Sequence, residues 1–112
     1  MSFLSRLGGL LTRGGREEDQ LRQAMEHAKG DRPKKAIEIY TSLVDSKGTS
    51  ADVRAKALFN RALAYSALRD DERASADLTQ VLALPNLAEN VQIAARSQLA
   101  RVRKRAEKRT TT

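Results

Sequence analysis

The stretch AKALFNRALAYSALRDDERASADLTQVLALP, which occupies residues 55–85, decides the fold. Its apolar residues recur at spacings of three and four, the period of a helix that buries one face. Asp70 or Asp71 can cap a new helix in the middle of the stretch, and Pro85 can stop it. The stretch therefore predicts two consecutive helices that pack as an antiparallel pair.

The same stretch resembles one repeat of the tetratricopeptide family, a helix–turn–helix unit with a characteristic order of large, small and aromatic residues. The positions of that pattern are filled by Leu58, Ala62, Tyr65, Ala74, Leu78 and Pro85. The chain departs from the pattern at Arg61, where leucine is preferred, and at Arg69, where a glycine is usual. Pro85 also falls one residue early. The resemblance implies a binding scaffold rather than a catalytic centre.

The flanking sequence extends the pattern in both directions. Upstream, an earlier repeat is indicated by Leu21, Ala24, Met25, Ala28, Ala36 and Tyr40. Downstream, the stripe of a fifth helix is formed by Val91, Ala94, Ala95, Leu99 and Val102. We therefore expect an all-α, right-handed tetratricopeptide-like stack of antiparallel helices. Its expected parts are a leader and glycine linker (1–16), the helical domain (17–108) with repeats at 17–48 and 49–86 and a capping helix at 87–108, and a frayed tail (109–112).

The sequence contains residues that predict where the helices begin and end. Gly30 is expected to end the first helix and Asp31 to cap the second, with Pro33 in its first turn. Thr49 with Asp52 forms a capping-box pattern for the third helix. The corresponding signals for the fifth helix are Asn86 and Glu89. A stack this short leaves apolar surface at its ends, and homodimerisation is one hypothesis for covering it.

The formal net charge is +7, and the positive charge is concentrated at the two ends of the chain. A basic patch is predicted near the C-terminus from Arg101, Arg103, Lys104, Arg105, Lys108 and Arg109. Such a run can bind nucleic acid through its phosphates, or it can be the polar outer face of a terminal helix. No aromatic residue lies near it to stack on bases, which disfavours single-strand recognition.

The N-terminal segment carries apolar residues on one helical face: Phe3, Leu4, Leu7, Leu10 and Leu11. It is too short to span a bilayer and lacks the features of a signal peptide. Three hypotheses stay open for this stripe: packing on the first repeat or disorder, contact with an anionic membrane surface, and occupation of a groove in this chain or a neighbour.

The resemblance implies where a partner would bind, because first helices of tetratricopeptide repeats line the concave face. By position, the groove would contain Lys56, Phe59, Asn60, Leu63, Ser66 and Ala67, joined by Arg22, Glu26 and Lys29. Some family members hold a peptide carboxylate with an asparagine at the position of Asn60. They also need basic residues where this chain has Glu89 and Ile93, so the carboxylate clamp is not expected here.

Catalysis has little support in the sequence. The chain has no cysteine, and its single histidine, His27, has no second histidine at helical spacing. The acidic residues Asp70, Asp71, Glu72 and Asp77 are expected to serve capping and solvation. We therefore expect a cytoplasmic non-enzyme without cofactor or metal, acting as an adaptor or scaffold that binds a peptide or helix. The alternatives are a helper peripheral to the inner face of a membrane, and a basic accessory protein that contacts nucleic acid.

Overall fold

The computed structural model describes the backbone of residues 13–111 and the side chains of residues 15–110. Within this range the chain is helical and contains no strand, which confirms the predicted all-α class. The helices are α2 (Arg13–Lys29), α3 (Pro33–Asp45), α4 (Ala51–Ala67), α5 (Asp71–Leu82) and α6 (Glu89–Thr111). Helix α2 begins before residue 17, and α6 continues beyond residue 108 into the tail that was expected to be frayed.

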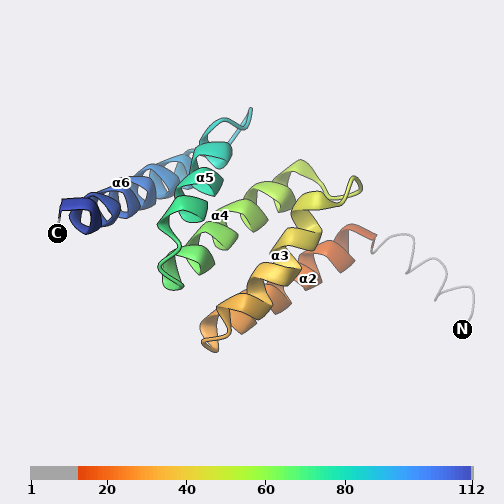
Figure 1. Cartoon of the computed structure of the whole chain (residues 1–112). Helices are drawn as coiled ribbons and strands as arrows, with labels where there is room; N and C mark the ends of the chain where they lie inside the picture. Colours follow the sequence, from red (N-terminus) through yellow and green to blue (C-terminus); the bar gives the residue numbers. More distant parts are fainter. Residues whose placement is uncertain (1–12, 112) are drawn as a thin grey trace, which may run out of the picture.

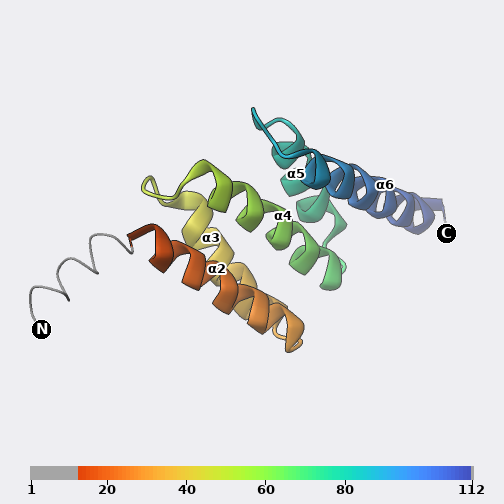
Figure 2. The ribbon, with the colours of Figure 1, turned by 180° about the vertical axis from the view of Figure 1, so that it is seen from behind.

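The helices follow one another in a row, from α2 at one end to α6 at the other (Figure 1). Each helix packs against the next one along the chain, and α2 also contacts α4. In Figure 1 helix α3 lies in front of α2, and the view from behind reverses this order (Figure 2). Most contacts are therefore between sequence neighbours, as short connections favour.

Two helix starts follow local capping chemistry. The Ser50 hydroxyl accepts a hydrogen bond from the Val53 backbone N–H at 3.2 Å and caps α4. The Asp70 carboxylate accepts from the Arg73 N–H at 3.1 Å, so Asp70 caps α5 and not Asp71, the other residue that the sequence allowed. The capping role predicted for Thr49 was wrong, because Thr49 is buried one residue before the cap. A hydroxyl one position further along has the geometry to reach the third helical N–H.

The α2–α3 and α4–α5 turns have the same geometry. Asp31 and Arg69 adopt left-handed conformations, with φ of 61° and 63°. In each turn the residue that follows donates its N–H back to a carbonyl in the preceding helix: Arg32 to His27 at 2.8 Å, and Asp70 to Tyr65 at 2.9 Å. This is the Schellman pattern of a helix C-terminus. Asp31 therefore ends α2 rather than capping α3, whose N-cap is Arg32 without a side-chain bond.

The two helix pairs also share their buried positions. Buried residues of α2 and α3 have buried counterparts in α4 and α5, always the same number of residues further along the chain. The pairs are Ala24 and Ala62, Ala36 and Ala74, Tyr40 and Leu78, and Leu43 and Val81. The carbonyls that accept the turn hydrogen bonds belong to His27 and Tyr65, which are separated by the same number of residues. The predicted groove residues Arg22, Glu26 and Lys29 therefore each lie one residue beyond the positions that match Phe59, Leu63 and Ser66.

The apolar core consists of two clusters. The first is built from α2, α3 and the buried residues Val53, Ala57 and Ala64 of α4. The second is built from α4, α5 and α6 and includes Leu58, Ala62, Leu78 and Val102. Helix α4 contributes to both clusters from different faces, so it links the two halves of the molecule.

Candidate functional site

A surface hollow of about 300 Å³ lies where α2, α3 and α4 meet, and we call it the α2–α4 hollow. Its lining residues are Met25, Ala28, Lys29, Asp31, Pro33, Tyr40, Asn60, Leu63, Ala64 and Ala67. Methionine, leucine, alanine and proline make most of this lining apolar. Such a surface can hold an apolar side chain of a ligand with a few polar groups to orient it.

The α2–α4 hollow combines a buried floor with polar groups around it. The ring of Tyr40 is 1% exposed, and its burial raises the pKa of Tyr40 to about 12. Its hydroxyl therefore stays neutral at physiological pH. Lys29 and Asp31 lie at the turn that ends α2 and contribute one charge of each sign. The hollow as a whole has no strong preference for an anion or a cation.

The side-chain amide of Asn60 is already engaged within its own helix. Its Nδ2 donates to the Lys56 carbonyl at 2.8 Å. The amide nitrogen has a second N–H, which this bond leaves available to a ligand. Ile93 is 60% exposed on α6, at a position where a carboxylate-binding site would need a cation.

The structure divides the predicted groove residues among several places. Lys29, Asn60, Leu63 and Ala67 line the α2–α4 hollow. Lys56 lines a second hollow of about 380 Å³ between the start of α4 and the Leu84–Val91 segment. Phe59 is half-buried against the second core cluster, and Ser66 bonds to α6. Arg22 pairs with Asp19 on the exposed face of α2, and Glu26 is exposed and lines neither hollow.

The lining residues that sequence reasoning missed are Met25, Ala28, Asp31, Pro33, Tyr40 and Ala64. The signal that could have found Met25 and Ala28 is the spacing of nine residues from Tyr65 to Ala74, which recurs from His27 to Ala36. With that register, Met25 matches Leu63 and Ala28 matches Ser66. Tyr40 could not be found in this way, because it belongs to α3 and reaches the hollow only through packing.

Two acidic residues that were expected to be solvated are buried. Asp77 is 5% exposed and Asp71 is 7% exposed. Asp77 accepts two hydrogen bonds from Arg61, which also donates to the Thr41 hydroxyl at 3.2 Å. The prediction of capping and solvation was therefore wrong for these two residues. Each lies on the packed face of α5, where a cation from another helix reaches it.

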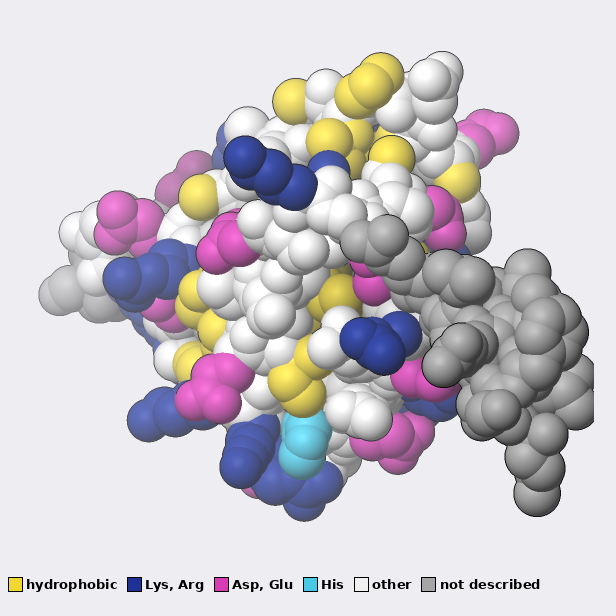
Figure 3. All heavy atoms as spheres, turned by 90° about the vertical axis from the view of Figure 1, so that its right-hand side faces the viewer, with side chains coloured by type: hydrophobic (Ala, Val, Ile, Leu, Met, Phe, Trp, Pro, Cys, Tyr) yellow, Lys and Arg dark blue, Asp and Glu magenta, His cyan; other side chains and the backbone are white. Residues whose placement is uncertain are grey.

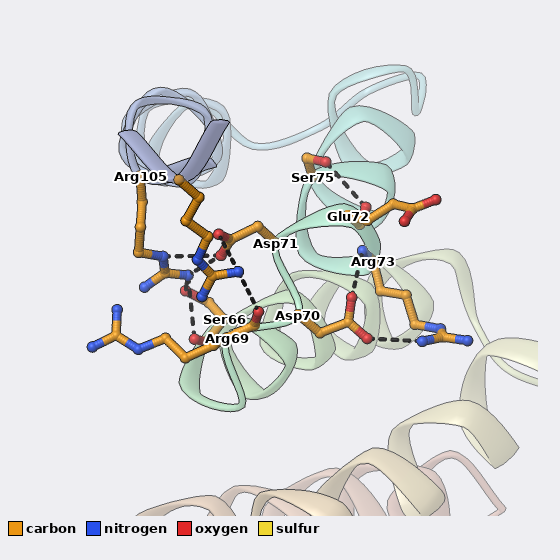
Figure 4. Close-up of polar contacts among 9 residues, drawn as sticks. Ser66, Arg69, Asp70, Asp71, Glu72, Arg73, Ser75 and Arg105 are labelled. Carbon is orange, nitrogen blue, oxygen red and sulfur yellow. Dashed lines mark hydrogen bonds and ion pairs between the residues drawn. The ribbon is translucent and has the colours of Figure 1, made fainter. Parts of the chain in front are cut away.

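Asp71 is the centre of a contact between α6 and the α4–α5 turn (Figure 4). The Arg105 guanidinium donates to the Asp71 carboxylate through Nε at 2.9 Å and also through Nη2. Nη2 further donates to the Ser66 hydroxyl at 2.8 Å. Arg109 adds a hydrogen bond to the Arg69 carbonyl at 3.0 Å and an ion pair with Asp71 at 3.3 Å. Two members of the predicted basic patch thus hold α6 onto the α4–α5 turn.

The remaining basic residues of α6 lie on its outer face. Arg96, Arg101, Arg103 and Lys104 are exposed, as is Lys108. The surface at the α2 end of the molecule is different: Figure 3 shows cations and anions interspersed there, with small groups of hydrophobic side chains between them. On α6, by contrast, the exposed cations from Arg96 to Lys104 have no acidic residue between them.

Metal-binding residues form no cluster in the part of the chain that the structure describes. No group of three or more His, Asp or Glu side chains that could hold a metal ion is found there. The Nδ1 atom of His27 accepts a hydrogen bond from the Arg32 Nε at 3.0 Å. His27 therefore takes part in the turn between α2 and α3.

The predicted N-terminal stripe of Phe3, Leu4, Leu7, Leu10 and Leu11 lies outside the described residues. Among the helices that are described, none combines the length and the apolar character that crossing a bilayer requires.

The chain was compared with protein-family models, curated proteins and solved structures, and none of the three comparisons found a match.

Proposed function

We propose that the chain is a tetratricopeptide-like interaction module that binds a short segment of a partner protein at the α2–α4 hollow. In this assignment α2–α3 and α4–α5 are two repeats and α6 is the capping helix. Three features support it: the pattern residues quoted for residues 55–85, the matching turns at Asp31 and Arg69, and the matching buried positions of the two helix pairs. Such repeats act by the surface they present.

The observation that carries the proposal is the chemistry of the α2–α4 hollow. Met25 and Leu63 offer an apolar contact between two helices, and the buried ring of Tyr40 forms a rigid floor. Lys29 and Asn60 can orient the backbone of a bound segment. We infer that the partner inserts one large apolar side chain and contacts the polar residues with its main chain.

A matched pair of substitutions tests this proposal. Ala67→Arg places a long side chain at the hollow, whereas Ala76→Arg places the same side chain on the exposed face of α5. Peptides selected from a random library against the wild-type chain should bind it in titration calorimetry. Their affinity should fall at least about tenfold with Ala67→Arg, which corresponds to about 1.4 kcal/mol, and stay unchanged with Ala76→Arg.

The same two variants serve for capture of partners from a nuclease-treated cell extract. A protein that is retained by the wild type and by Ala76→Arg, but lost with Ala67→Arg, would support binding at the hollow. The proposal would be refuted if all three proteins retained the same partners equally and the library peptides bound Ala67→Arg as tightly as the wild type. Circular dichroism of both variants checks that the helices persist.

A further inference from the structure

The outer face of α6 carries four cations that we call the α6 basic ridge: Arg96, Arg101, Arg103 and Lys104. All four are exposed, and none forms an ion pair with a side chain among residues 15–110. No acidic residue occurs between Ile93 and Lys104. The ridge thus contains no acidic residue between its first and last cation, and the exposed Glu107 follows one turn after Lys104.

The ridge is distinct from the two arginines that follow it. Arg105 is 25% exposed in its side chain and is held by Asp71, and Arg109 contacts the Arg69 carbonyl. These two side chains turn toward the α4–α5 turn. The basic run near the C-terminus therefore has two parts in the structure. Arg105 and Arg109 hold α6 against the α4–α5 turn, and the ridge residues are exposed.

Helical spacing spreads the ridge cations across the exposed face of α6. Arg96 and Arg103 are two turns apart and share one flank, and Arg101 lies on the other. Lys104 lies at the centre of the face, one turn beyond Ala100 and in the same stripe as Ile93. A helix with cations on both flanks can approach two phosphate backbones, as helices in the major groove do.

We propose that the α6 basic ridge binds the phosphate backbone of double-stranded nucleic acid without sequence preference. This second surface goes beyond the proposed peptide site, because the α2–α4 hollow has no lining residue on α6. A polyphosphate gains affinity through release of its condensed counterions, so charges alone suffice to bind it. A duplex fits better than a single strand, because α6 contains no aromatic residue on which bases could stack.

The same face suits an acidic helix of a partner protein less well. Exposed pairs between single carboxylates and single cations contribute little each, so such a helix would need a large apolar contact in addition. The centre of the ridge offers only Ile93 as a large apolar side chain, 60% exposed, beside the small Ala100. The charge pattern therefore favours a polyanion.

Fluorescence anisotropy with random-sequence DNA and RNA duplexes of roughly two helical turns tests the proposal. Binding should weaken steeply between about 50 and 200 mM salt. The plot of log affinity against log salt should have a slope of roughly −3 to −4, since each neutralised phosphate contributes about −0.9.

Two triple variants remove the same number of positive charges from different places. The first, R101Q/R103Q/K104Q, neutralises the ridge. The second, K34Q/K35Q/K47Q, neutralises exposed lysines at α3 and the loop after it. The ridge variant should lose at least about tenfold in affinity and flatten the salt slope by about 2 to 3. The lysine variant should keep most of the affinity and the slope.

Three results would overturn the proposal. Equal losses in both triple variants would mean that only net charge matters. No measurable duplex binding at about 50 mM salt would exclude the ridge as a phosphate site. Tighter, ridge-dependent binding of an acidic helical peptide than of either duplex would assign the surface to a protein partner instead. Ala67→Arg should leave duplex binding unchanged, which keeps this test separate from that of the hollow.

Discussion

Arg61 and Asp77 are joined by two parallel hydrogen bonds between α4 and α5. The distances are 2.8 Å from Nε to Oδ2 and 2.8 Å from Nη2 to Oδ1. Their side chains are 14% and 7% exposed. The bond to Asp77 raises the pKa of Arg61 above its ordinary value, and the guanidinium carbon also lies 5.7 Å from the centre of the Tyr65 ring. The pair therefore replaces, at a core position, the leucine that the tetratricopeptide pattern prefers.

Asp77→Ala should lower the free energy of unfolding by about 3 kcal/mol, because it leaves a largely buried guanidinium without its partner. Arg61→Leu combined with Asp77→Ala should recover most of this loss, since an apolar side chain removes the buried charge. Urea unfolding followed by circular dichroism measures both. A double variant as unstable as Asp77→Ala would contradict this account of the pair.

Arg105→Ala should loosen the C-terminal half of α6 from the α4–α5 turn. The buried Asp71 carboxylate loses its shortest contacts, so the unfolding free energy should fall by about 2 to 3 kcal/mol. Amide hydrogen exchange should accelerate in the last turns of α6. Arg105→Lys should restore only part of the loss, because lysine cannot reproduce the forked bonds to Asp71 and Ser66.

Arg103→Ala provides the control for this prediction, because Arg103 is exposed on the same helix. Its effect on stability should stay within about 0.5 kcal/mol. Similar losses for Arg103→Ala and Arg105→Ala would show that helix propensity, and not the contact with Asp71, accounts for the effect.

Arg69→Gly should stabilise the fold by roughly 0.5 to 1 kcal/mol. A left-handed residue with a Cβ costs about 1 to 2 kcal/mol, and glycine removes that cost at the expense of a more flexible unfolded chain. The backbone carbonyl that Arg109 contacts is retained. Thermal unfolding of Arg69→Gly should show a higher Tm. Gln80→Gly, in the interior of α5, should instead lower the free energy of unfolding by about 1 kcal/mol and so lower the Tm. A lower Tm for Arg69→Gly would disprove the strain argument.

Asp70 should make stability depend on pH in the acid range. The hydrogen bond from the Arg73 side chain holds the pKa of Asp70 below its ordinary value. A carboxyl whose folded pKa is lowered stabilises the fold above its unfolded pKa, near 3.8, and loses this contribution as pH falls through the folded pKa. Wild type should therefore exceed Asp70→Asn in stability at pH above about 5.

That difference should shrink as the pH falls below about 4. Asparagine keeps the capping oxygen, so Asp70→Ala should lose about 1 kcal/mol more than Asp70→Asn at neutral pH. Urea unfolding at several pH values measures both effects. A constant difference between wild type and Asp70→Asn across this pH range would rule out the charge as its source.

Much of the helical architecture was predictable from local sequence. The spacing of Leu58, Ala62, Ala74 and Leu78 predicted two helices with one buried face each, and all four residues are buried. A cap at Asp70 or Asp71 was also predictable, because a cap acts within one turn of its own helix. Thr49 and Asp31 failed as caps because a shift of one residue changes which N–H a side chain can reach.

The α2–α4 hollow was predictable only in part. Asn60 and Leu63 were expected from their places in the repeat pattern, and both line it. Met25 and Tyr40 were not, because the first unit deviates from the pattern and its register depends on how the α2–α3 turn closes. That turn is closed by a left-handed aspartate, Asp31, next to the glycine that was expected to end the helix.

By itself, the sequence determined that the chain is helical and that Leu58, Ala62, Ala74 and Leu78 are buried, because both follow from periodicity within a single helix. Only the tertiary structure decided which charges are buried. Arg61 meets Asp77 and Arg105 meets Asp71 from separate helices, whereas Arg103 and Lys104 face outward on α6. In the sequence Arg103, Lys104 and Arg105 are three consecutive cations, and nothing local distinguishes the one that is partly buried. The difference arises because burial of a charge depends on a partner that packing brings to it from elsewhere in the chain.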